Sequence, residues 1–274
     1  MASWDDVAVR EGYATIGRTG PFVYGLTNYI AANLSANVLL AAGAGPAIGA
    51  ASDWVTTFPA GASAVWINTA SLMSSDEESL RAVARTAHEA GTPWVLDPVA
   101  VGAGAPEYDA FVRSLLEFRP SVIRGNASEL IALAGGEATG KGVETTVDSS
   151  SAVAVVGAFA AEIGAVVAVS GPVDYISDGS RTVEVPGGDL RLTQVTGAGC
   201  ALGALTAAAV FATGDAFQGA VVAHAAYAVA AERAGARTRG TGSFAVALVD
   251  ELSLLVSDEA GHTSPEALLG QAAQ

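Results

Sequence analysis

The sequence is poor in charge, in aromatic side chains and in cysteine. Charged residues make up 15% of its 274 residues, aromatic residues make up 7%, and Cys200 is the only cysteine. A single cysteine excludes a disulfide within the chain, which is consistent with a reducing compartment. Lysine and arginine number 13 against 28 acidic residues, a formal net charge of −15. Binding to a nucleic-acid backbone depends on Lys and Arg, so we expect no nucleic-acid partner.

Signals for membranes and for secretion are also missing. The mean hydropathy is +0.41, but glycine and polar residues interrupt the charge-free stretches before they reach the roughly 20 apolar residues that cross a membrane. The first residues, MASWDDVAVREGY, are acidic where a signal peptide is basic. We therefore expect a cytoplasmic protein without a membrane segment.

Apolar residues, by contrast, are abundant at 51%. A chain of this length can form one large α/β domain, and we expect a single domain over residues 1–274. Because charged residues are so few, nearly every expected element has an apolar face. This composition favours a sheet that is covered by helices on both faces.

Segments typical of helices alternate with segments typical of short strands. The expected helices are Asn28–Leu40, Ser75–Ala90, Tyr108–Phe118, Ala127–Ala134, Ser151–Ile163, Cys200–Thr213 and Phe217–Ala231. The expected strands are Ala64–Thr69, Pro93–Leu96, Ser121–Arg124 and Ala165–Ser170, followed by a hairpin of Tyr175–Ile176 with Arg181–Val185. Such alternation implies right-handed crossovers and a largely parallel sheet, whose ligands bind beyond the carboxyl ends of the strands.

A glycine turn, Thr196-Gly197-Ala198-Gly199-Cys200, precedes one of these helices. Backbone amides at such a junction, together with the helix dipole, form a site for an anion. The alternative is a tight loop whose glycines only solve a packing problem. Cys200 would lie in the first turn, where the dipole lowers the pKa of a thiol and makes it a base or a nucleophile. Otherwise it is a small buried apolar residue.

A second candidate site begins at Arg124, at the end of an expected strand. Arg124 would face a phosphate, and Asn126 would cap the next helix. Glu129 would project near the same helix end and hold Mg²⁺ through water. It is equally consistent with the sequence that Asn126 and Glu129 form a capping box and that Arg124 is a surface cation. Asp97, before Pro98 at the end of another strand, is a third candidate, or else a turn residue.

Two further patterns carry no functional prediction. Gly135–Gly142 has the spacing of a Walker A phosphate loop, but it ends in Gly instead of a hydroxyl residue and follows a helix, so we reject it. His88, His224 and His262 lack metal-ligand spacing, and each is interpreted as a residue on a helix face.

Six segments, in this order, resemble the hydroxyethylthiazole kinase family over nearly the whole chain. They are Leu26–Gly49, Leu96–Gly104 (LDPVAVGAG), Ile123–Gly135, Gly140–Glu144, Ala168–Gly179 and Thr193–Leu205 (TQVTGAGCALGAL). The N-x-x-E pattern that starts at Asn126 and the G-A-G loop are also typical of the wider ribokinase-like class. The resemblance implies a ribokinase-like three-layer α/β/α fold, with a largely parallel central sheet and a small hairpin near residues 175–185.

The same resemblance implies a reaction and a set of site residues. The reaction is transfer of the ATP γ-phosphate to the primary hydroxyl of 4-methyl-5-(2-hydroxyethyl)thiazole, with Mg²⁺, in thiamine salvage. The implied contacts are Arg124, Asn126, Ser170 and Thr196 for ATP, Glu129 and Asp97 for the metal, Asn28, Ile48 and Gly197 for the substrate, and Gly197, Gly199 and Cys200 for catalysis. It further implies a homotrimer with active sites between subunits, in which the Asn28–Ile48 segment serves a neighbouring chain.

The chain departs from the family pattern at several positions. Ile48, Gly45 and Gly25 stand where Met, Ser and Cys are common, and these positions bear on substrate choice. Ala198 and Ser170 stand where Thr is frequent. These changes leave the phosphate chemistry intact, because Ser170 keeps a hydroxyl and residue 198 contributes mainly its backbone.

Two other functions stay open at this point. A different ribokinase-like vitamin kinase, for hydroxymethylpyrimidine or pyridoxal, would share the fold, although the Asn-containing block Leu26–Gly49 argues against it. A non-catalytic nucleotide-binding protein would keep Arg124 and Glu129 but would need no base at Cys200.

Overall fold

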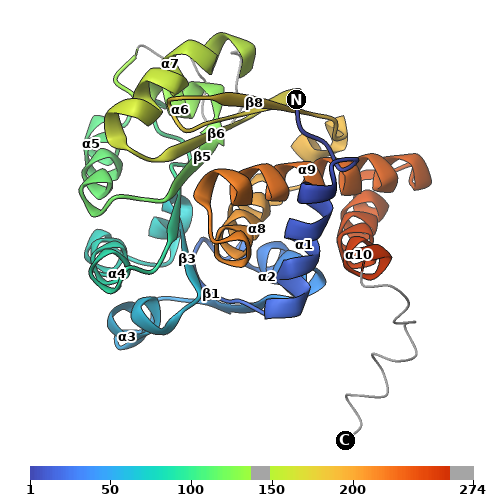
Figure 1. Ribbon diagram of the computed structural model, residues 1–274. Coiled ribbons are helices and arrows are strands. Elements are labelled where there is room, and N and C mark those ends of the chain that lie inside the picture. Colours follow the sequence, from blue (N-terminus) through green and yellow to red (C-terminus); the bar gives the residue numbers. More distant parts are fainter. Residues whose placement is uncertain (137–148, 260–274) are drawn as a thin grey trace, which may run out of the picture.

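The computed structural model describes residues 1–136 and 149–259 (Figure 1). Within these residues the strands form an eight-stranded sheet in the order β2-β1-β3-β4-β5-β6-β7-β8. The strands are β1 Phe22–Leu26, β2 Gly45–Ile48, β3 Ala64–Asn68, β4 Trp94–Asp97, β5 Val122–Asn126, β6 Val166–Ser170, β7 Val173–Ser177 and β8 Thr182–Pro186. Strands β1 to β6 pair in parallel, whereas β7 and β8 add antiparallel to the β6 edge.

Helices cover both faces of this sheet (Figure 1). They are α1 Val7–Thr19, α2 Ala32–Ala41, α3 Trp54–Gly61, α4 Glu77–Ala90, α5 Pro106–Ser114, α6 Ala127–Leu133, α7 Ser149–Ile163, α8 Ala198–Thr213, α9 Ala216–Arg237 and α10 Thr241–Glu259. Short 3-10 helices lie at Thr69–Met73, Leu115–Phe118 and Leu190–Gln194. Helices α3 to α7 cover one face, and α1, α2, α8, α9 and α10 cover the other.

Each face of the sheet has its own hydrophobic core. Alternate residues of one strand point to opposite faces, so in β3 Trp66 belongs to the core under α8 and α9, and Ile67 to the core under α4. Helix α8 is the central helix of its layer and packs on β3 and β4. Its Ala- and Gly-rich sequence lets its backbone come close to the strands.

Most of the expected elements are present in the structure. The four expected strands, the hairpin and the parallel sheet are confirmed, and helix ends differ by a few residues. The helix expected from Asn28 begins instead at Ala32, because Asn28 is used in the preceding turn. The sequence analysis did not identify α1, β1, β2, α3 or α10.

Some expectations fall outside the described residues. Most of the Walker-like segment Gly135–Gly142, the family segment Gly140–Glu144 and His262 lie there. Over the ranges that the structure does describe, no helix is long and apolar enough to pass through a membrane.

Candidate active site

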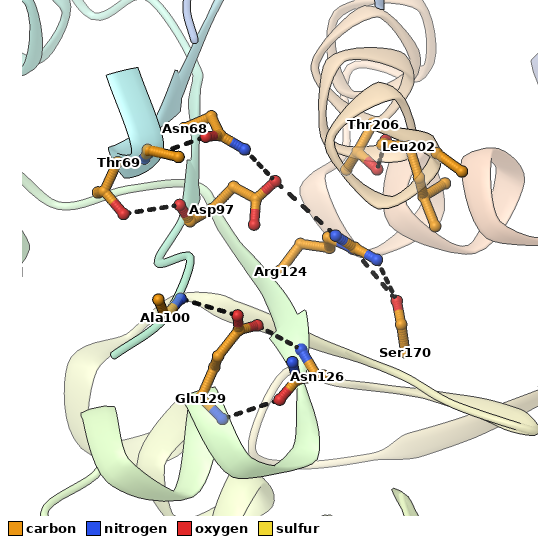
Figure 2. A network of polar contacts seen from close by, with 12 residues as sticks. Asn68, Thr69, Asp97, Ala100, Arg124, Asn126, Glu129, Ser170, Leu202 and Thr206 are labelled. Atoms are coloured by element: carbon orange, nitrogen blue, oxygen red, sulfur yellow. Dashed lines mark hydrogen bonds and ion pairs between the residues drawn. The ribbon is translucent and has the colours of Figure 1, made fainter. Parts of the chain in front are cut away.

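Polar side chains gather where the parallel strands end, beside the first turn of α8 (Figure 2). Asn68 is the last residue of β3 and pairs in register with Asp97, the last residue of β4. In the same way Asn126 of β5 pairs with Ser170 of β6. The parallel strands therefore bring four strand-end residues to the same edge of the sheet, where open α/β sheets bind ligands.

Arg124 lies two residues before Asn126 on β5, the strand between β4 and β6, and is 9% exposed. Its Nε and Nη2 donate to Ser170 Oγ at 3.1 and 2.8 Å, and its Nη1 lies 3.7 Å from Asp97 Oδ2. A Cβ placed on Gly199, in the first turn of α8, would lie 3.2 Å from Nη1. Arg124 is thus a buried cation held between two strands and a helix start, and its interpretation as a surface cation is wrong.

Asp97 is 1% exposed and keeps one of its oxygens uncommitted. Its Oδ2 accepts from Asn68 Nδ2 at 2.9 Å, whereas Oδ1 has no hydrogen-bond partner among the described residues. Figure 2 shows this second oxygen on the side that faces Glu129. Burial raises the pKa of Asp97 to about 7, although the nearby Arg124 opposes the shift. A buried carboxylate oxygen without a protein partner is available to a cation or to a hydrogen-bond donor.

Asn126 and Glu129 form the capping box that the sequence allowed. Asn126 Oδ1 accepts from the Glu129 amide at 3.0 Å, and Glu129 Oε2 accepts from the Asn126 amide at 2.9 Å. Glu129 Oε1 accepts a further bond, at 2.9 Å, from the amide of Ala100 in the loop that follows β4. Burial raises the pKa of Glu129, and the two backbone amides oppose that shift. The capping role fixes the carboxylate in place beside Asp97, so it does not exclude a second role.

The two carboxylates suit a magnesium ion that is completed by phosphate and water. Mg²⁺ in such sites is held by one or two carboxylates together with substrate phosphates. Asp97 Oδ1 supplies an uncommitted oxygen, and Glu129 faces it across the end of β4. No cluster of three or more His, Cys, Asp or Glu that could hold an ion by itself occurs in residues 1–136 and 149–259. Two carboxylates are the number that Mg²⁺ takes from a protein when phosphate and water supply its other ligands.

The start of α8 has the geometry predicted for an anion site. Gly197 is the N-cap residue, and its φ of 83° is a left-handed conformation that glycine adopts without strain. The helix begins at Ala198, whose own amide is bonded to Val195 O, and the amides of the first turn have no acceptor within a helix. Thr196 is exposed just ahead of them, and Gly199 faces Arg124. This end of α8 can hold the negative charge of a phosphate.

The prediction for the thiol of Cys200 is wrong in its direction. Burial raises the pKa of Cys200 to about 12, the nearby Asp97 adds to the shift, and Arg124 opposes it. The sequence analysis took the lowered pKa from the helix dipole alone. It could not show that the thiol would be partly buried next to a carboxylate.

Two expected substrate residues lie at different distances from Arg124. Asn28 is 8% exposed, and its Oδ1 accepts from the amides of Ile30 and Ala31. A Cβ on Gly197 would lie 3.1 Å from Ala31 Cα, so this turn adjoins the anion site. Ile48 ends the edge strand β2, four strands from β5, which is about 19 Å at the usual strand spacing. One chain therefore does not bring Ile48 next to the phosphate residues.

Asn68 and Trp66 are site residues that the sequence analysis missed. Asn68 is fully buried and orients Asp97, and Trp66 lies on the same strand with its Nε1 directed at Gly203 of α8. The sequence did contain a signal for Asn68. It is a polar residue at the end of a buried apolar strand, as Asp97 is at the end of the following strand. Trp66 also explains the unusual Gly25: a Cβ there would lie 2.9 Å from its ring.

Comparison with known proteins matches this chain to one family model. The model describes the hydroxyethylthiazole kinase family and matches residues 14–258. A protein of Burkholderia thailandensis named "Hydroxyethylthiazole kinase" is 68% identical over 253 residues, 92% of this chain and 97% of that protein. One of the same name from Leptospira borgpetersenii is 41% identical over 92% of this chain and 96% of that protein.

Solved structures agree with this match. A hydroxyethylthiazole kinase protein from Pyrococcus horikoshii OT3 has a TM-score of 0.79 and 34% identity, with 89% of this chain and 92% of that chain covered. An ADP complex of Bacillus subtilis pyridoxal kinase has a TM-score of 0.56 and 17% identity, over 76% and 90% of the two chains, which shows the fold alone. A ribokinase-like superfamily protein from Enterococcus faecalis has a TM-score of 0.59 at 10% identity, over 93% of this chain and 91% of that one. The fold is the expected ribokinase-like three-layer α/β/α arrangement.

Proposed function

The chain belongs to the hydroxyethylthiazole kinase family, and from this we propose that it phosphorylates the primary hydroxyl of 4-methyl-5-(2-hydroxyethyl)thiazole with ATP in thiamine salvage. The observation that carries the proposal is Arg124, a buried arginine that joins Asp97 and Ser170 beneath the start of α8. A buried cation beside free helix amides is suited to a polyphosphate.

Arg124 and Ser170 hold the ATP phosphates in this proposal. Arg124 keeps its guanidinium between the strand ends, and the Ser170 hydroxyl, which accepts from Arg124, still has its own proton to donate to a phosphate oxygen. Thr196 lies at the rim of the same site, and the side-chain amide of Asn126 is a donor that its capping bond does not use.

Asp97 and Glu129 would hold Mg²⁺, Glu129 through water. The ion, when bound with ATP, neutralises charge on the phosphates. For this role Asp97 offers Oδ1, while Asn68 and Arg124 hold Oδ2. Glu129 is kept rigid by its two backbone amides.

The amides that follow Gly197 face the transferring phosphoryl group in this proposal, with Gly199 leaving room for Arg124. Phosphoryl transfer passes through a loose transition state, so positioning and charge neutralisation supply most of the catalysis. Cys200 lines this anion site. A role as general base is the alternative, and its raised pKa of about 12 weighs against it.

The substrate alcohol would bind between Asn28 and Ile48 at the boundary of two subunits of a cytoplasmic homotrimer. Two features support this proposal. Ile48 is too distant from Arg124 within one chain, and large apolar side chains near the same edge are exposed: Tyr29 68%, Ile30 51% and Leu40 59%. A neighbouring subunit would cover these side chains and bring its own Ile48 to the site.

A phosphotransfer assay tests the proposed function. The enzyme is given ATP and Mg²⁺ with the thiazole alcohol, with hydroxymethylpyrimidine or with pyridoxal, and each product is measured. We expect turnover of the thiazole alcohol to exceed that of the other two. Preferred turnover of pyridoxal or the pyrimidine would replace the substrate assignment, and turnover of none would favour a nucleotide-binding protein without catalysis.

Substitution of Arg124 tests the observation that carries the proposal. Arg124→Met should reduce kcat by about 100- to 1,000-fold, the typical loss when one donor to a developing charge is removed. Arg18→Met is the control, because Arg18 pairs with Glu11 on the exposed surface of α1. Equal activity of the two variants would contradict the placement of the phosphates.

A further inference from the structure

Helix α9 places two polar side chains one turn apart on its buried face. His224 is 0% exposed and Tyr227 is 3% exposed, and most of the other residues on this face are alanine and valine. Burying an imidazole or a phenol costs free energy unless its polar atoms are hydrogen-bonded. The partners of these two side chains therefore indicate what they do.

Tyr227 is bonded to the start of α8. Its hydroxyl donates to the carbonyl of Ala198 at 2.7 Å, and Ala198 is the first residue of α8, directly after Gly197. Burial raises the pKa of Tyr227, so the hydroxyl keeps its proton and remains a donor. The bond ties α9 to the turn whose amides form the anion site.

His224 is linked to the turn after β6 through Asp174, the second residue of β7. Its Nδ1 lies 2.6 Å from Asp174 Oδ2, and because a carboxylate only accepts, Nδ1 donates. The other oxygen, Asp174 Oδ1, accepts from the amide of Gly171 at 2.8 Å. Nε2 of His224 has no partner among the described residues, so the bond to Asp174 is the polar contact to test.

The turn held by Asp174 leads directly to a proposed ATP contact. Gly171 follows Ser170, the acceptor of two bonds from Arg124. Because Asp174 Oδ1 accepts from the amide of Gly171, loss of the bond from His224 acts on the residue directly after Ser170.

We propose that His224 and Tyr227 are positioning residues that fix the spacing between the Ser170–Gly171 turn and the first turn of α8. Two segments far apart in sequence, one ending β6 and one opening α8, are thereby held from one rigid helix. This inference rests on the proposed function for the assignment of both segments to the ATP phosphates. Loss of either bond loosens one half of the phosphate site and leaves the other half in place.

Three variants test this inference. Tyr227→Phe removes only the hydroxyl, and His224→Leu removes the ring donor. His224→Asn keeps a donor close to the position of Nδ1. The dissociation constant of ADP with Mg²⁺ is measured by calorimetry, together with KM for ATP, KM for the thiazole alcohol and the melting temperature.

Tyr227→Phe and His224→Leu should each raise the ADP dissociation constant and KM for ATP by about 2- to 10-fold, the value of one hydrogen bond. KM for the thiazole alcohol should stay within about twofold, and His224→Asn should recover most of the ADP affinity. If the two residues only stabilised the fold, their replacement would not raise KM for ATP selectively over KM for the thiazole alcohol.

Tyr13→Phe is the matched control. Tyr13 is fully buried and its hydroxyl donates to Leu252 O at 2.9 Å, a bond of the same kind between α1 and α10. The Tyr13→Phe variant should have a lower melting temperature and an unchanged affinity for ADP. If Tyr227→Phe and His224→Leu behave like Tyr13→Phe, the inference is overturned.

The outcome is distinguishable from failure of the proposed function. A parent protein that binds ADP but does not phosphorylate the thiazole alcohol contradicts the substrate assignment alone, and the ADP measurements still decide the role of α9. A parent protein that binds no ADP overturns both proposals.

Discussion

Cys200 shows how a local effect and a tertiary effect act on one side chain in opposite directions. The start of α8 favours a thiolate, whereas burial next to Asp97 raises the thiol pKa to about 12. The net effect is a raised pKa, which favours a neutral thiol that lines the anion site over a thiolate that removes a proton.

Replacement of Cys200 decides between these two roles. Cys200→Ala and Cys200→Ser should lose far less than the roughly 100-fold that removal of a general base costs. Cys200→Asp should lose more than either, because it adds negative charge close to Asp97. The measurement is kcat with the thiazole alcohol at saturating ATP. A base role requires the reverse order, with Cys200→Ser nearly inactive and Cys200→Asp active.

Arg124, Asn126 and Glu129 illustrate what the residue scale reveals before a structure exists. Their types and spacing predicted a strand end, a helix cap and a carboxylate at one place, and all three are there. The sequence left open whether Arg124 was at the surface. Its burial depends on α8, a helix that begins more than 70 residues later in the chain.

At the scale of elements, the close packing of α8 on the sheet depends on its glycines. Gly203 lies one turn beyond the start of the helix, against Trp66 of β3 and Asp97 of β4. A Cβ there would lie 2.7 Å from Trp66 Nε1 and 3.1 Å from Asp97 Oδ2. This glycine therefore lets the helix approach the strand ends and sets the position of the carboxylate.

Gly203→Ala and Gly25→Ala form a matched pair that tests this approach. Both add a methyl group against Trp66, and both should lower the free energy of unfolding by about 1–3 kcal/mol through overpacking. Only Gly203→Ala also presses on Asp97, so it alone should raise the Mg²⁺ concentration needed for half-maximal activity. Denaturant unfolding and magnesium titration measure the two effects. An unchanged magnesium requirement in Gly203→Ala would mean that Asp97 is not set by α8.

Two of the elements that the sequence analysis missed, β2 and α3, share a physical reason. Strand β2 is four residues long, with all of its side chains partly exposed, and α3 contains Pro59. Short or interrupted elements of this kind have weak local patterns, and contacts with β1 and α4 stabilise them instead. Two of the strands that were predicted, β3 and β4, are by contrast fully buried and mostly apolar, which makes them recognisable from the sequence.

At the scale of the whole molecule, the phosphate residues and Ile48 lie on well-separated strands of the sheet. The proposed trimer resolves this separation by combining two chains at each site. An oligomer with closed symmetry repeats the same shared site at every boundary between subunits.

Mixing two inactive variants tests whether sites are shared. Arg124→Met and Ile48→Asp should each be inactive alone, because each damages every site. When equal amounts are unfolded and refolded together, about a quarter of the shared sites should have both residues intact, as random assembly of a closed ring requires. Activity of the mixture and its mass by light scattering are measured. A trimer in which mixing recovers no activity would place Ile48 and Arg124 in the same chain's site.

The sequence by itself determined the alternation of helices and buried strands, the parallel sheet and the family, because these depend on local apolar patterns and on ordered segments such as Leu96–Gly104 and Thr193–Leu205. Only the tertiary structure decided the burial of Arg124, the free oxygen of Asp97, the raised pKa of Cys200 and the bonds from α9. Burial and pairing depend on which distant segments meet at the strand ends, and no local pattern carries that information.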